Sequence, residues 1–287
     1  MPDIARLCII GVGLIGGSLA LALRQAGAVG SVIGVGRSAA NLEEAVRLGI
    51  IDSYSHDAAT AVESADMVVL AVPVGSIRPV CEQIRDHLPA DAILTDVGSV
   101  KADVVEQVRA GFGELPARFV PGHPIAGTEK SGAAAAFPEL YQGRRVLLTP
   151  LQETFPEALA KVRRMWESVG AEVETMTVEH HDTVLAATSH LPHMLAFGLV
   201  DSLARQQDSD EIFRYAAGGF RDFTRIASSD PVMWRDICMH NGPALLGAMS
   251  RFEEEMAELR DAIEQGDSDR LVEIFSRAKA ARDKFAG

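Results

Sequence analysis

Several residue types are scarce in this chain, and each scarcity excludes a class of protein. Three cysteines, Cys8, Cys81 and Cys238, are scattered through 287 residues, so they predict neither a disulfide framework nor a metal site. No apolar run approaches the ~18 residues that span a bilayer, so we expect a soluble protein without a membrane partner. The residues after Met1 lack the pattern of a secretory signal, which predicts a cytoplasmic location.

Positive charge is also scarce. Lysine and arginine number 27 against 40 acidic residues, which gives a formal net charge of −13. This charge repels phosphate backbones and no basic stripe offsets it, so we expect no nucleic-acid partner. The length suits two domains, each with its own hydrophobic core.

The first part of the chain alternates short β-branched runs with amphipathic helical segments, which predicts an α/β domain with a mostly parallel sheet. The expected strands are residues 7–10, 31–35, 67–72, 92–96, 118–120, 145–149 and 172–176. The helices expected between them include residues 18–25, 40–48 and 155–169.

Beyond residue 176 the β-rich runs disappear. Helical periodicity covers residues 178–204, 231–239, 243–265 and 268–285. We therefore predict a nucleotide-binding domain over residues 1–176 and an all-helical domain over residues 177–287. Residues 178–204 are apolar over much of the helix circumference, which favours a helix buried in a homodimer interface, or else in the centre of a monomer.

A glycine motif follows the first expected strand and opens the first helix. In this context Gly11, Gly13 and Gly16 predict a Rossmann-type, doubly wound dinucleotide-binding domain. Gly11 permits a tight turn, Gly13 lets a pyrophosphate approach the backbone, and Gly16 allows close packing of helix and strand. We expect Leu14 and Ile15 to contribute to the cofactor site, where the positive end of the helix faces the phosphates.

The end of the second expected strand bears on the choice of cofactor, because an acidic residue there usually binds the ribose 2′-hydroxyl of NAD. This chain instead has Gly36, followed by Arg37 and Ser38, which could receive the 2′-phosphate of NADP. We expect NADP, with NAD as the alternative if Arg37 is only a solvated turn residue. Val72 and Pro73 are also assigned to the cofactor site.

Two loops, residues 96–101 and 121–130, are expected at the carboxyl ends of strands, where open α/β sheets bind ligands. In the second loop His123 lies between a glycine and a proline, which predicts a rigid, exposed imidazole suited to general-base work. In the helical part, polar groups interrupt an apolar segment at residues 189–193, and arginines accompany a glycine-rich turn at residues 218–225.

With these motifs in this order, the sequence resembles the prephenate and arogenate dehydrogenases of tyrosine biosynthesis over nearly the whole chain. The matching segments are residues 11–18, 98–101, 123–132, 189–193 and 219–234. The resemblance implies oxidative decarboxylation of prephenate or arogenate. A hydride leaves the hydroxyl-bearing ring carbon for NAD(P), the ring carboxylate departs as carbon dioxide, and the ring becomes aromatic.

The resemblance also implies roles for individual residues. It makes His123 the acceptor for the ring hydroxyl and Ser99 the residue that orients it. Arg225 would hold a substrate carboxylate, for which a guanidinium is well suited. Lys101 would add positive charge near cofactor or substrate, or else remain solvated. The pocket near the substrate's side chain would be lined by Ser189, His193 and Thr128.

Other polar residues of these motifs receive structural interpretations. We expect His190 to be structural, His180 and His181 to be exposed at the start of the long helix, and Arg221 to be a surface residue. Trp234 is expected to pack at the edge of the site, because tryptophan contributes apolar area before chemistry.

The sequence leaves the choice of substrate and two rival functions open. Glu129 could pair with the ammonium of arogenate, or with Lys130 in solvent. Another NADP-dependent dehydrogenase of the β-hydroxyacid type is an alternative, although neither Asn41 nor Asn241 follows a lysine by four residues, as that family's catalytic pair requires. A non-catalytic NADP-binding protein is the other alternative.

Overall fold

The computed structural model describes residues 2–128 and 130–286, so Glu129 lies outside the described residues. By its contacts the chain divides into two compact units, Met1–Gly242 and Pro243–Gly287. The first unit holds both sheets and most of the helices, and the second is a helical hairpin. The boundary between the compact units therefore comes later in the sequence than residue 176, the end of the last expected strand.

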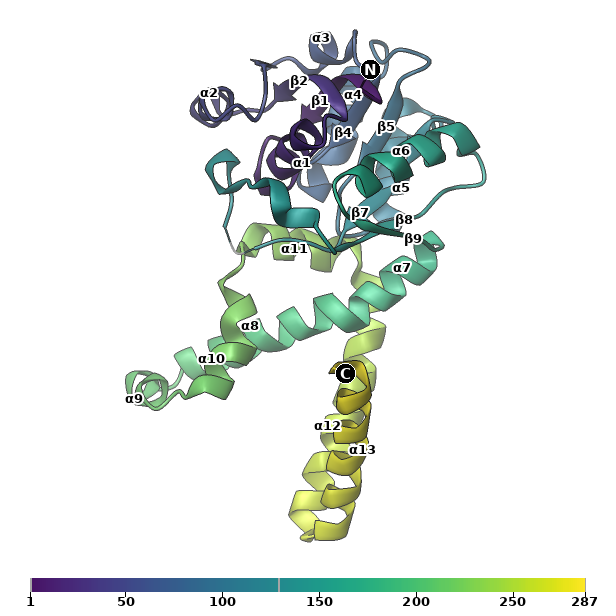
Figure 1. The fold of residues 1–287 in the computed structure, drawn as a ribbon. Helices are drawn as coiled ribbons and strands as arrows, with labels where there is room; N and C mark the ends of the chain where they lie inside the picture. The colour runs from purple at the N-terminus through teal and green to yellow at the C-terminus, as the bar shows by residue number, and fades with distance from the viewer. Residues whose placement is uncertain (1, 129, 287) are drawn as a thin grey trace. The chain divides into compact units, whose positions relative to one another are not determined.

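The main sheet of the first unit has six parallel strands in the order β3-β2-β1-β4-β5-β6 (Figure 1). The strands are β1 (Ile4–Ile10), β2 (Val29–Val35), β3 (Ser53–Ser55), β4 (Met67–Leu70), β5 (Ile93–Asp96) and β6 (Phe119–Val120). This order confirms the predicted Rossmann-type fold, although the sequence pattern had not indicated β3. The order reverses between β1 and β4, which is where such sheets open a crevice for ligands.

Helices cover both faces of this sheet. Successive side chains of a strand point to opposite faces, so each strand contributes apolar side chains to both cores. In β1, Leu7 and Ile9 belong to one hydrophobic core, and Cys8 and Ile10 belong to the other. The helices of this region are α1 (Leu14–Gln25), α2 (Ala39–Arg47), α3 (Ala58–Val62), α4 (Ile77–Ile84), α5 (Ala102–Phe112) and α6 (Pro156–Ser168).

A second, three-stranded sheet follows β6. It contains β7 (Gly122–Pro124), β8 (Arg145–Leu148) and β9 (Glu172–Thr175). β7 runs antiparallel to β8, and β8 runs parallel to β9. The expected strands at residues 145–149 and 172–176 therefore exist but do not extend the main sheet. Pro121, which has no N–H to donate to a ladder, separates β6 from β7 and lets the chain turn towards β8.

The helical part of the first unit begins with one long helix. It is composed of α7 (Val178–Leu185), a π-helical turn η4 (Ala186–His190) and α8 (Leu191–Ala204). Pro192 accounts for the π turn, since it cannot donate a hydrogen bond to the preceding turn. The remaining elements are α9 (Ser209–Arg214), α10 (Gly218–Thr224), a 3-10 turn η5 (Arg225–Ser228) and α11 (Pro231–His240).

This long helix is long and apolar enough, by length and composition alone, to cross a membrane, with a mean hydropathy of 1.3 over its most apolar window. Polar residues, among them Ser189, His190 and His193, interrupt this helix, so it holds no continuous apolar run of ~18 residues. Burial of the helix in the centre of one chain is wrong for α8, because Ala196 is its one buried residue in the described chain. Most apolar side chains of α8 are half-buried, and Leu199 is exposed.

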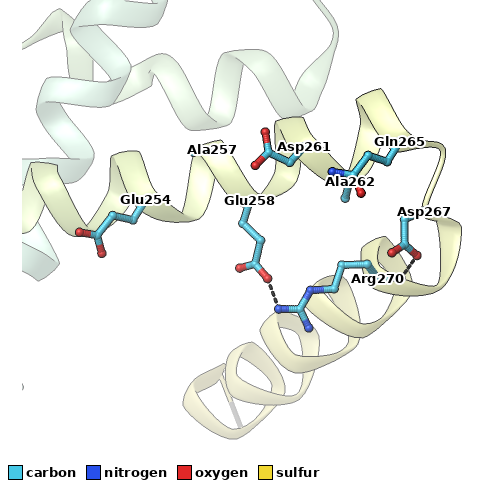
Figure 2. A pocket seen from close by; sticks show the side chains of 8 residues that line it. All are labelled: Glu254, Ala257, Glu258, Asp261, Ala262, Gln265, Asp267 and Arg270. Carbon is cyan, nitrogen blue, oxygen red and sulfur yellow. Dashed lines mark hydrogen bonds and ion pairs between the residues drawn. The ribbon is translucent and has the colours of Figure 1, made fainter.

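The second unit consists of α12 (Gly242–Gln265) and α13 (Ser268–Ala286), joined by a turn in which Gly266 has a φ of 67°. An ion pair of Arg270 with Glu258 joins the two helices near this turn, and Arg270 also pairs with Glu273 within α13. An open groove lies beside it (Figure 2) and is lined by Glu254, Ala257, Glu258, Asp261, Ala262, Gln265, Asp267 and Arg270.

Two glycines, Gly11 in the turn after β1 and Gly16 in the first turn of α1, leave no room for a side chain. Gly11 has a φ of 103°, and a Cβ there would lie 2.3 Å from the Ala71 carbonyl oxygen. A Cβ on Gly16 would lie 2.5 Å from the Gly11 carbonyl oxygen. By contrast, a Cβ on Gly13 would meet no described atom within 4 Å.

We predict that Gly16→Ala lowers the free energy of unfolding by about 2 kcal/mol or more, because the new methyl group forces backbone apart. Gly13→Ala serves as the matched control and should cost less than about 1 kcal/mol, since its backbone is extended and its surroundings are open. Urea titration of both variants measures the difference. Equal losses would contradict the packing described for Gly16.

Candidate active site

The crevice at the reversal of strand order has the features of a phosphate cradle. Gly13 is the N-cap of α1, and in the described chain no side chain caps this helix end. The amides of Leu14 and Ile15 therefore begin the helix beside the open space at Gly13. An uncapped helix N-terminus with room for close approach fits the pyrophosphate of a dinucleotide.

Side chains from later in the sequence hold this glycine turn. The Asn41 amide donates to the Val12 carbonyl over 2.7 Å and accepts from the Ala133 N–H over 2.9 Å. The Tyr141 hydroxyl donates to the Ile15 carbonyl over 2.6 Å. Sequence reasoning missed both supports, because they come from segments that only the fold brings to the turn.

The residues expected to select the cofactor lie after β2 and β4. Arg37 is exposed, and within the described residues its guanidinium has no hydrogen-bond or ion-pair partner. The Ser38 hydroxyl is already used, since it caps α2 by accepting from the Asn41 N–H over 3.3 Å. Val72 is half-buried and Pro73 is exposed, just beyond the end of β4.

Asp96 ends β5 and connects the loops of residues 96–101 and 121–130. Its fully buried carboxylate forms an ion pair with Lys101 and accepts from the N–H groups of Gly98 and Gly122, over 2.7 and 3.1 Å. Lys101 also donates to the Gly122 carbonyl over 2.7 Å. These bonds fix the loop of residues 96–101 against β7, the strand that carries His123.

Lys101 is fully buried, so the alternative of a solvated lysine is wrong. Burial lowers the pKa of Lys101, while the neighbouring charge of Asp96 opposes this shift. The ammonium is engaged by Asp96 and by the Gly122 carbonyl. A direct contact of Lys101 with substrate stays a prediction.

His123 is also less exposed than the sequence indicates. It lies in β7, pairs with Leu147 of β8 and is 8% exposed, so the predicted exposed imidazole is wrong. Its Nδ1 atom is 2.9 Å from Nε2 of His181. Burial lowers the pKa of His123 well below its usual value, and nearby His181, Lys101 and His190 lower it further. The imidazole is therefore neutral near pH 7.

His181 and Asp182 complete this cluster, and sequence reasoning missed both. His181 was expected at the surface but is fully buried, because β7 and α5 pack against the start of α7. Its Nδ1 atom is 2.8 Å from the Asp182 carboxylate. That carboxylate also accepts from the N–H groups of Lys101 and Ala102, each over 2.8 Å.

A second group of predicted residues lies on the long helix and on the helices that follow it. His193 stacks on Trp234 with ring centroids 3.7 Å apart, and its Nδ1 atom is 2.8 Å from the Ser189 carbonyl oxygen. Burial lowers the pKa of His193, and the charge of Arg225 lowers it further. η5, which begins at Arg225, packs against α8, which carries His193. Both Arg225 and Arg221 are exposed.

His190 lies between the two groups. It is buried, its Nδ1 atom is 3.1 Å from the amide nitrogen of Asn241, and its ring meets Trp234 edge-on. Burial lowers the pKa of His190 to about 4. These contacts support a structural role for His190. The exposed position of His180 agrees with its expected place on the surface.

Two predicted site residues form no hydrogen bond with the histidines of these groups in the part of the chain that the structure describes. Ser99 is half-buried in the loop that Asp96 holds, and no hydrogen bond joins it to His123. The exposed hydroxyl of Thr128 accepts from the Lys130 N–H over 3.2 Å. Their contacts with substrate stay predictions.

We predict that Lys101→Met lowers the free energy of unfolding by about 3–5 kcal/mol, because it leaves the buried Asp96 carboxylate without its cation. Adding Asp96→Asn should recover part of this loss, since the uncompensated charge is then removed. A double-mutant cycle in urea measures the coupling. A loss below about 1 kcal/mol for Lys101→Met would contradict the importance given to this pair.

Comparison with known proteins identifies the family. The model of the prephenate dehydrogenase nucleotide-binding domain matches residues 19–175, and that of the prephenate dehydrogenase dimerization domain matches residues 177–277. Cyclohexadienyl dehydrogenase of Zymomonas mobilis is 39% identical over 98% of this chain and 96% of its own length. Prephenate dehydrogenase of Bacillus subtilis is 37% identical over 96% of this chain and 75% of its own length.

Solved structures agree with these matches. Prephenate dehydrogenase of Aquifex aeolicus, solved with hydroxyphenyl propionate and NAD⁺, has a TM-score of 0.92 and 42% identity, and the match covers 98% of each chain. Synechocystis arogenate dehydrogenase has a TM-score of 0.81 and 31% identity, over 98% of this chain and 99% of that one. This chain therefore belongs to the prephenate dehydrogenase family, the NAD(P)-dependent enzymes that oxidatively decarboxylate prephenate or arogenate in tyrosine biosynthesis.

Proposed function

We propose that His123 is the general base of this dehydrogenase and that its Nε2 atom accepts the proton of the ring hydroxyl. The observation that carries this proposal is the neutral, buried imidazole, whose Nδ1 atom is engaged by His181. Its other nitrogen, Nε2, is then the one that can meet a substrate. A neutral histidine is the usual group for such a proton transfer near neutral pH.

The remaining site residues bind and orient the substrate in this proposal. Arg225 holds the side-chain carboxylate, Ser99 orients the ring hydroxyl against His123, and Lys101 contributes positive charge. The rest of the pocket is lined by Ser189, His193 and Thr128. The packing of η5, which begins at Arg225, against α8, which carries His193, supports this assignment.

In this proposal one proton passes to His123 and back while the substrate loses a hydride and carbon dioxide. The hydroxyl proton moves to Nε2 of His123 as the ring carbon gives up its hydride, and the electrons of the C–COO⁻ bond then enter the ring as carbon dioxide leaves. His123 returns the proton to the oxygen, which gives a phenol without net proton release. The bound nicotinamide supplies the hydride acceptor, and the cradle formed by Gly11, Gly13, Leu14, Ile15 and Gly16 would hold its pyrophosphate.

We predict that His123→Ala lowers kcat by about 10²-fold or more, with cofactor affinity unchanged, because the variant loses the proton acceptor. The assay follows reduced-nicotinamide absorbance with prephenate or arogenate, each with NAD or NADP, and so also shows substrate preference. His180→Ala is the matched control, since His180 is exposed, and it should keep wild-type turnover. Near wild-type turnover of His123→Ala would remove this residue from the mechanism.

We further propose that the chain prefers NADP over NAD. No acidic residue follows β2 at residues 36–38, and the guanidinium of Arg37 is available for a 2′-phosphate. Ser38, Val72 and Pro73 border the same site in this proposal.

Arg37→Ala should weaken NADP binding by about tenfold and leave NAD binding nearly unchanged, since a charge-assisted contact is lost only with NADP. Titration of both cofactors by fluorescence measures this. Arg47→Ala is the control, because Arg47 is already paired with Glu44 in α2. An equal loss of affinity for both cofactors would indicate that Arg37 does not bind the 2′-phosphate.

The helical part of the chain supports a third proposal, that residues 177–287 form a dimerisation domain after a nucleotide-binding domain of residues 1–176. The match to a family dimerization domain and the incomplete burial of the apolar helix α8 support a homodimer. Further exposed apolar side chains occur in the hairpin, namely Leu246, Ile263, Val272 and Phe275. A second copy, rather than a membrane or a nucleic acid, would cover these surfaces in a cytoplasmic enzyme.

A further inference from the structure

We propose that His181 and Asp182 are a positioning pair that keeps the proton of His123 on Nδ1 and so leaves Nε2 free to act as the base. This inference rests on the proposed role of His123. Both residues act through His123 rather than by touching the substrate.

Asp182 sets the direction of the hydrogen bonds. Its carboxylate accepts from the backbone N–H groups of Lys101 and Ala102, at the N-terminus of α5. Burial would raise the pKa of Asp182, but the bonds from His181 and from these two amides outweigh burial and lower it. An ionised carboxylate has no proton to give, so Nδ1 of His181, 2.8 Å away, is the donor.

His181 donates to Asp182 and accepts a hydrogen bond from His123. Burial and the charge of Lys101 lower the pKa of His181, while Asp182 and Asp96 oppose the shift without reversing it. A neutral imidazole carries one N–H, and Asp182 already holds it on Nδ1. Nε2 of His181 is therefore an acceptor.

His123 is the last member of the chain. Its Nδ1 atom lies 2.9 Å from Nε2 of His181, and two lone pairs cannot face each other at that distance. His123 must donate from Nδ1, and because it is neutral its Nε2 atom carries a lone pair. Without His181, the proton of His123 could occupy either nitrogen, and only one of the two tautomers can accept a proton at Nε2.

The same pair stabilises His123 after it has taken the proton. The imidazolium that forms still donates from Nδ1 to His181, and the negative charge of Asp182 lies on the far side of that ring. Asp182 need not take the proton itself, as in other catalytic histidine–carboxylate arrangements. The pair therefore supports both the resting tautomer and the charged state.

The direct test is nitrogen NMR of the wild-type protein labelled with ¹⁵N-histidine, recorded without substrate at neutral pH. The resonance pair of His123, assigned by its loss in His123→Gln, should show a protonated Nδ1 and an unprotonated Nε2. A protonated Nε2 with an unprotonated Nδ1 would overturn the proposal. This spectrum does not depend on catalysis, so it decides the tautomer even if the chain turns over neither substrate and the proposed function fails.

Kinetics of Asp182→Asn give a second test, because an amide in place of the carboxylate permits the opposite hydrogen-bond direction. We expect kcat to fall by about 10²-fold or more with KM within about threefold, and the NMR signature of His123 to change. Glu179→Gln, the same chemical change at an exposed position of α7, should alter neither. A folded Asp182→Asn protein with wild-type kcat and an unchanged His123 spectrum would overturn the proposal. If this variant does not fold, the wild-type spectrum alone decides.

Discussion

The active site depends on the buried ion pair between Asp96 and Lys101. Neither charge is tolerable in this position without the other, and the same two side chains bond to Gly98 and Gly122, on the two loops that carry the site. The backbone N–H of Lys101 also holds Asp182. One electrostatic constraint thus connects the end of the main sheet, the strand of His123 and the first turns of the long helix.

Much of the fold was predictable because it follows from local rules. The alternation of strands and helices, and the glycines at positions 11 and 16, depend on backbone geometry and packing within short segments. The loops at residues 96–101 and 121–130 were found because strand ends collect functional side chains in parallel sheets. The pairing of β8 with β7 depends on how the chain turns after Pro121, which no local pattern indicates.

The environment of the candidate base was not predictable in the same way. Lys101 and Asp182 are 81 residues apart in sequence. No local pattern therefore indicates that Lys101, at the start of a helix, is buried rather than solvated. One available signal was overlooked. His181 and Asp182 precede the buried residues Leu185 and Ala186 by four positions each, and that spacing puts them on the buried face of a helix. Polar residues on such a face require partners, which here belong to the active site.

The most direct test of this account is a crystal structure of the protein with oxidised cofactor and hydroxyphenyl propionate, a ligand already seen in the Aquifex aeolicus relative. The account predicts the phenol oxygen at hydrogen-bond distance, about 2.6–3.2 Å, from Nε2 of His123. It also predicts the ligand carboxylate at the guanidinium of Arg225. A ligand bound in the reverse orientation, or with its phenol oxygen away from His123, would contradict it.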